Sequence, residues 1–65
     1  MNWDQIAGSW KEMMGAARAK WGEITEDEWH QIAGRRDEMV GTLQRRYGIE
    51  KEEAERELDD WSQGL

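Results

Sequence analysis

The sequence predicts an all-α protein, built as a compact bundle of four to five short helices with two related helical hairpins packed on each other. Three observations lead to this prediction: apolar residues recur at helical spacing, proline is absent, and one segment occurs twice. A chain of 65 residues has room for only one domain, residues 1–65.

The two copies of the repeated segment are residues 3–22 and 29–48, which align with a shift of 26 residues. Nine of the twenty aligned positions are identical, pairing Trp3, Gln5, Ile6, Ala7, Gly8, Glu12, Met13, Gly15 and Gly22 with Trp29, Gln31, Ile32, Ala33, Gly34, Glu38, Met39, Gly41 and Gly48. Two copies are too few for a solenoid, so we expect two helical units that pack face to face.

In the first copy we expect a short helix, a break at Gly8 and then a longer helix. An apolar stripe marks one face of the longer helix: Trp10, Met13, Met14, Ala17 and Trp21. Gly22 follows this stripe, where a left-handed residue commonly ends a helix. Gly15 lies inside the helix at a cost of about 1 kcal/mol relative to alanine. Because Gly41 repeats this feature, we expect another helix to cross closely at both glycines.

In the second copy, Thr25 with Glu28 three residues later predicts a capping box and a helix that begins near Glu26. Gly34 again marks a break, and Gly48 is expected to end the following helix. The last helix is expected over residues 51–61. The predicted core takes the large apolar residues of these helices: Trp10, Met13, Trp21, Trp29, Ile32, Met39, Leu43, Tyr47, Leu58 and Trp61.

The chain has little material for catalysis or metal binding. It contains no cysteine and a single histidine, His30, without a sequence context that indicates a nucleophile. The acidic residues at 26–28 and 50–53 fit the first turns of helices and do not match a calcium loop. We therefore expect no catalytic residue, cofactor or metal, and predict that the protein is not an enzyme.

The charge distribution restricts the partners. A net charge of −6 argues against nucleic acid, and no apolar run is long enough to cross a membrane or serve as a signal peptide. We expect a cytoplasmic monomer. Residues 34–48 nevertheless carry a local charge of +2 through Arg35, Arg36, Arg45 and Arg46, whereas residues 49–65 carry −5. The arginines form a possible surface for an unknown protein partner, unless they compensate the acidic segment within the monomer.

The chain also resembles the CsbD-like small stress-response proteins of bacteria. The resemblance covers nearly the whole chain and is most specific in residues 34–48, where Gly34-Arg35-Arg36-Asp37, Gly41 and Gln44-Arg45-Arg46-Tyr47-Gly48 follow the family pattern. It implies a compact helical bundle that accumulates in the cytoplasm under general stress, with no catalytic or ligand residues to carry over. The segment Ala16–Ala19 departs from the pattern because relatives have more lysine there.

These observations together predict a non-catalytic, stress-associated helical protein of structural or protective role. The alternative is an adaptor that binds a protein partner through residues 34–48.

Overall fold

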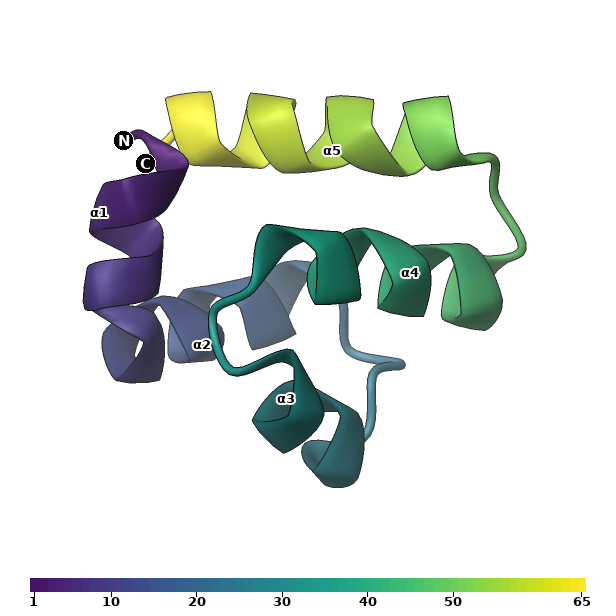
Figure 1. Ribbon diagram of the computed structural model, residues 1–65, viewed down its shortest axis with the longest axis horizontal. Coiled ribbons are helices and arrows are strands. Elements are labelled where there is room, and N and C mark those ends of the chain that lie inside the picture. Colours follow the sequence, from purple (N-terminus) through teal and green to yellow (C-terminus); the bar gives the residue numbers. More distant parts are fainter.

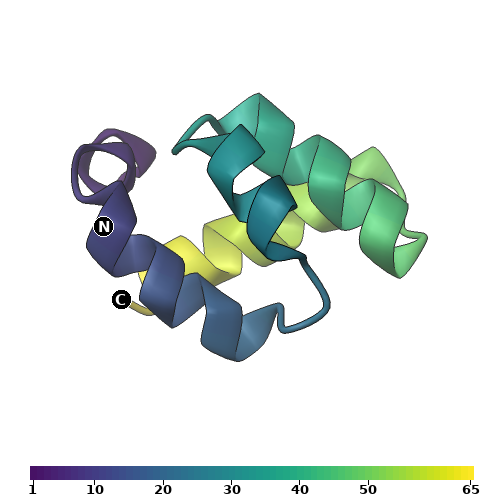
Figure 2. The same cartoon turned by 90° about the horizontal axis from the view of Figure 1, so that it is seen from below.

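The computed structural model describes residues 1–65 and contains five helices and no strand, which confirms the all-α prediction. The helices are α1 (Trp3–Gly8), α2 (Trp10–Lys20), α3 (Glu26–Ile32), α4 (Arg36–Tyr47) and α5 (Lys51–Gln63). Figure 1 shows α4 and α5 side by side as an antiparallel pair, α1 turned across the start of α2, and the two termini close together. Seen from below, α3 lies in front, with α2 and α4 on either side of it (Figure 2).

Two helices begin with a side-chain cap that the local sequence supplies. Asn2 accepts a hydrogen bond from the backbone N–H of Gln5, whose side chain in turn accepts one from the backbone N–H of Asn2. Thr25 and Glu28 form the same reciprocal pair at the start of α3, as the sequence predicted. Each cap satisfies backbone N–H groups that have no partner within the helix.

The helix ends follow the sequence prediction in one copy and depart from it in the other. Gly48 ends α4 in the left-handed region, with φ 63°. The same prediction for Gly22 is wrong, because α2 ends at Trp21 with φ −119° and Gly22 has no positive φ. Trp21 follows the helix with φ −119° and ψ 67°, and its buried ring packs edge-on against Trp61 at a centroid distance of 5.3 Å.

The core lies between the two repeats and α5. Six of the ten residues expected there are buried: Trp21, Trp29, Ile32, Met39, Leu43 and Leu58. The other four, Trp10, Met13, Tyr47 and Trp61, are only half-buried. Ile6 and Ile24 complete the apolar interior together with Ala17, Val40 and Ala54. A chain this small has many core residues at the boundary with solvent, because its surface is large relative to its volume.

Some equivalent residues of the two copies lie in equivalent environments, whereas Met13 is half-buried and its partner Met39 is buried. Ile6 and its partner Ile32 are both fully buried, as are Ala17 and its partner Leu43. Each copy consists of a short helix followed by a longer one, α1 with α2 and α3 with α4. The short helix of each copy therefore contributes one isoleucine to the interior.

The close approach expected at Gly15 and Gly41 is instead found at Gly34. A Cβ atom at Gly15 would have no neighbour within 4 Å, and one at Gly41 would meet only the flexible Arg45 side chain, so that expectation is wrong. A Cβ atom at Gly34 would lie 3.5 Å from Ala7 and from the Cβ atom of Trp10. The repeats therefore touch where the α3–α4 turn meets α1 and the start of α2.

Candidate functional site

The four arginines proposed as a partner surface do not form one patch. Arg36 is directed toward α5, where it forms an ion pair with Asp59 at 2.8 Å and donates to the carbonyl oxygen of Glu55. Its guanidinium also lies 5.8 Å from the ring centroid of Trp3. Arg46 lies on another side of α4 and donates to the Glu28 carboxylate of α3. Two of the four arginines, Arg36 and Arg46, thus form ion pairs within the molecule.

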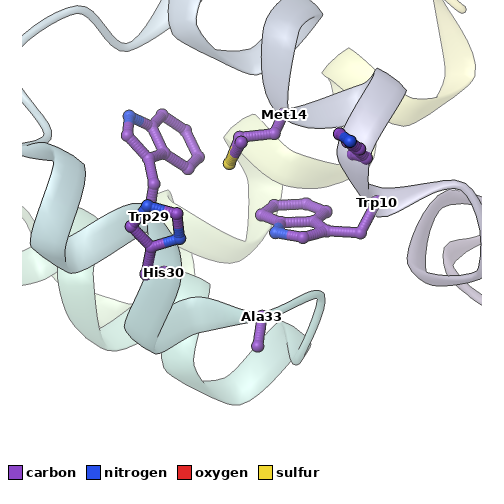
Figure 3. Close-up of a pocket in the computed structure, with 6 residues that line it drawn as sticks. Trp10, Met14, Trp29, His30 and Ala33 are labelled. Atoms are coloured by element: carbon purple, nitrogen blue, oxygen red, sulfur yellow. The ribbon is translucent and has the colours of Figure 1, made fainter.

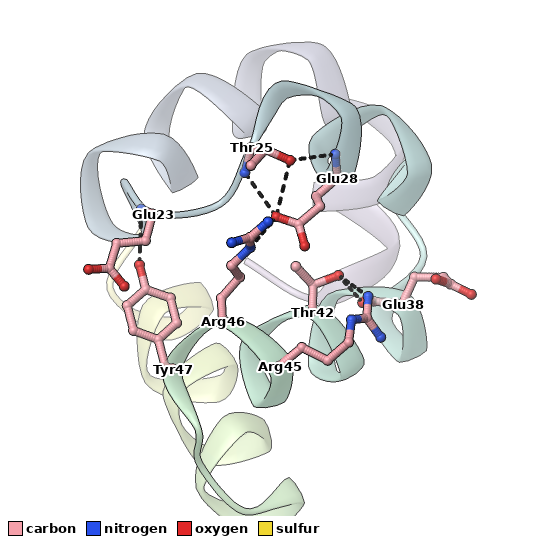
Figure 4. Close-up of polar contacts among 8 residues, drawn as sticks. All are labelled: Glu23, Thr25, Glu28, Glu38, Thr42, Arg45, Arg46 and Tyr47. Atoms are coloured by element: carbon pink, nitrogen blue, oxygen red, sulfur yellow. Dashed lines mark hydrogen bonds and ion pairs between the residues drawn. The ribbon is translucent and has the colours of Figure 1, made fainter.

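Arg35, the N-cap residue of α4, and Arg45 on α4 are exposed and form no ion pair with another helix. Arg35 is 4.0 Å from the Glu38 carboxylate and donates to the carbonyl oxygen of Gln31. Thr42 donates to the carbonyl oxygen of Glu38, and Arg45 donates to the Thr42 hydroxyl (Figure 4). This line of polar contacts is the part of the arginine-rich segment that stays open to a partner.

A second polar network joins α3 to α4 around Glu28 (Figure 4). The Glu28 carboxylate accepts hydrogen bonds from the backbone N–H and hydroxyl of Thr25 and from Arg46 at 2.6 Å. The backbone N–H of Thr25, followed by Arg46, holds the pKa of this carboxyl below its ordinary value, although partial burial opposes the shift. Glu28 therefore stays ionised and ties the start of α3 to α4.

His30 lies on the exposed face of α3. Its Nε2 atom is 3.6 Å from the Glu26 carboxylate, one helical turn earlier. No group of three or more His, Cys, Asp or Glu side chains is placed to hold a metal ion.

A groove between α2 and the end of α3 is the one hollow in the surface, with a volume of about 310 Å³. Figure 3 shows Trp10 and Met14 of α2 facing Trp29 of α3, with Ala33 beyond them. The Trp10 and Trp29 rings are tilted and their centroids are 6.1 Å apart. Lys11 and His30 complete the lining, so an apolar interior meets two basic side chains. This groove is the site best shaped to take a ligand.

The sequence predicts Trp10 and Trp29 in the core and does not indicate the groove. Trp29 is indeed 1% exposed, but Trp10 is only half-buried. The repeat contains one indication of the different role of Trp10. In the second copy the aligned residue is Arg36, so the repeated fold does not require an aromatic ring at this position. A tryptophan that the repeat does not require was the residue to single out.

None of the five helices combines the length and the apolar character that crossing a membrane requires.

Comparisons with known proteins agree along almost the whole chain. The CsbD-like family model matches residues 4–56. A UPF0337 protein of Mesorhizobium japonicum is 56% identical over 61 residues, covering 94% of this chain and 91% of the relative. A UPF0337 protein of Rhizobium meliloti is 54% identical, covering 94% and 88%. The UPF0337 protein YjbJ of Escherichia coli is 43% identical over 63 residues, covering 97% and 91%.

No solved structure matches the chain at a significant level. The family match spans both repeats and reaches into α5, so it includes the arginine-rich segment and every residue that lines the groove. The chain belongs to the CsbD-like family.

Proposed function

We propose that this protein is a non-catalytic protective protein that accumulates in the bacterial cytoplasm under stress and acts through its charged exterior. The observation that carries the proposal is the composition of the surface. Met1 and Leu65 are the large hydrophobic residues that are exposed, whereas the acidic and basic side chains all lie at least partly in solvent. Such a surface offers no large apolar patch for self-association.

The net charge supports the same role. Molecules that each carry −6 repel one another and stay dispersed at high concentration. We call the proteins that would be protected the clients. When molecules of this protein are dispersed between them, they would keep partly unfolded clients apart during drying or heating. Excluded volume contributes little, since crowding favours compact states by only about 0.2–1 kcal/mol. The expected benefit is therefore less client aggregation, with little change in the client's melting temperature.

A labile enzyme dried together with this protein tests the proposal. The variants compared differ in net charge, and the activity recovered on rehydration is measured. Glu23, Glu50 and Asp60 are exposed acids outside the first turns of the helices, and none forms an ion pair. Neutralising them as E23Q/E50Q/D60N should reduce the enzyme activity recovered on rehydration. The matched control E23D/E50D/D60E keeps the charge and should protect like the unchanged protein. Equal protection by both variants and by an inert protein of the same mass would reject the proposal.

The association with stress has its own test. The amount of the protein in cells should rise after osmotic, heat or drying stress, as measured by quantitative immunoblotting against a constitutive protein. A constant level under all three conditions would contradict this part of the proposal.

The adaptor role is a second candidate, favoured by the exposed side chains of Arg35 and Arg45. Affinity capture from stressed cells should recover a partner with the unchanged protein and lose it with R35E/R45E. The control K51E/R56E makes the same charge change at exposed positions of α5. A partner that binds all three forms equally, or none, would argue against this surface.

A further inference from the structure

The groove between α2 and α3 has features that a protective surface does not need. Its interior is formed by two indole rings and the Met14 thioether, and its volume of about 310 Å³ is at the lower end for small-molecule sites. A site of this size admits one ring or a short chain. It is too small for a folded segment of another protein.

One residue that lines the groove, Trp10, carries a hydrogen-bond donor without an acceptor. The Nε1 atom of Trp10 is buried and has no partner, whereas Trp3 donates to Gly34 and Trp21 donates to Glu57. A buried donor left unsatisfied is costly, and native structures rarely leave one without a reason. Figure 3 shows the nitrogen-bearing edge of Trp10 turned toward His30. A ligand oxygen at this edge would satisfy the donor once the indole turns slightly outward.

The charge at the rim selects the kind of ligand. Lys11 and His30 both line the groove, in a protein whose net charge is −6. Lys11 forms no ion pair, and Glu26 lies beside His30 at 3.6 Å. Aromatic faces alone would also suit a cation. The Lys11 ammonium at the rim disfavours a cation and attracts an anion.

We infer that this groove binds a small carboxylate with an apolar body. The body, an aromatic ring or short chain, lies against Trp10, Met14 and Trp29. The carboxylate faces Lys11 and accepts a hydrogen bond from the indole N–H of Trp10. This inference is independent of the protective role, because it concerns a single site and not the charged exterior.

Three probes of one shape and different charge test the inference by NMR. 4-Phenylbutanoate, its uncharged amide and 4-phenylbutylamine are titrated separately into the ¹⁵N-labelled protein. The carboxylate should shift the indole N–H signals of Trp10 and Trp29, with saturation near millimolar concentration, and should bind at least fivefold more tightly than the amide or the amine. No saturable shift at 10 mM, or equal affinity for all three probes, would overturn the inference.

Two exposed lysines provide a matched pair of variants. Lys11 lies at the groove and Lys51 begins α5 on the surface, and both are exposed, so neither change threatens the fold. K11E should weaken binding of 4-phenylbutanoate at least fivefold, whereas K51E, with the same net charge, should change it less than twofold. Equal weakening by the two variants would show that overall charge governs binding and would reject a specific site.

A third variant tests the donor directly. W10F removes the indole N–H while keeping an aromatic ring, and should weaken the carboxylate more than the amine. Unchanged selectivity between these two probes would overturn the assignment of Trp10 as the donor.

Discussion

The indole nitrogen of Trp3 donates a hydrogen bond to the backbone carbonyl of Gly34 over 2.9 Å. Trp3 opens the first copy of the repeat, and Gly34 lies in the turn between the two helices of the second. This bond therefore joins one copy to the other at a place where Gly34 lies close to Ala7 and Trp10.

Removing this bond should cost more than removing an indole N–H that has no partner. W3F loses the bond to Gly34, worth about 1 kcal/mol, together with part of the ring. W10F loses the same ring atoms but removes an unsatisfied buried donor, so the free energy of unfolding should fall by less. Urea denaturation of both variants gives the comparison, and an equal or larger loss for W10F would contradict the role assigned to the Trp3 bond.

Truncation of Trp21 should destabilise the fold more than truncation of Trp61. It is 2% exposed, packs on Trp61 and donates to the Glu57 carboxylate at 3.2 Å. We expect W21A to lower the free energy of unfolding by about 3–5 kcal/mol, and W61A, at a half-buried position, to lower it less. Thermal and urea melts followed by circular dichroism measure both. A loss below about 1 kcal/mol for W21A would show that its ring is not part of the core.

Two glycines should respond to alanine in opposite directions. Gly34 has φ 81°, so G34A should destabilise the protein by about 1–2 kcal/mol. Gly15 lies inside α2 with open space around it, so G15A should stabilise by about 0.5–1 kcal/mol. Chemical denaturation of the two variants measures both changes in the free energy of unfolding. A destabilising G15A would mean that the helix interior tolerates no side chain there.

Glu28 should make stability depend on pH in the acidic range. Its folded-state pKa lies below the ordinary value of 4.5, so its stabilising contribution is present above about pH 4.5 and is lost as the pH falls through the folded pKa. E28Q keeps a capping side chain and removes the titration. The difference in unfolding free energy between the two proteins should shrink from pH 6 to pH 3. A difference that stays constant or grows would be inconsistent with this assignment.

Local rules accounted for much of the secondary structure. The Thr25–Glu28 capping box and the start of α3 at Glu26 need only neighbouring residues, as does the left-handed end of α4 at Gly48. Gly22 shows the limit of such rules. It follows an aromatic residue as Gly48 does, but that residue, Trp21, already departs from helical geometry, with its ring packed against Trp61 on α5.

The candidate site depended on distant contacts even more. The groove joins Trp10 and Trp29, which are nineteen positions apart on different helices, and neither residue by itself indicates a cavity. The arginines showed the converse: the members of each adjacent pair, Arg35-Arg36 and Arg45-Arg46, take different partners, because Arg36 pairs with Asp59 and Arg46 with Glu28.

The sequence by itself determined the helical class and the capping of α3, because periodicity and capping depend on residues within one or two turns of each other. It also determined the repeat and the family, because both are recognised from the order of the residues. The tertiary structure alone decided which tryptophans stay half-buried, which arginines form contacts between helices and where Gly34 meets the first copy. These features depend on the relative placement of helices, and that placement results from packing the whole interior at once.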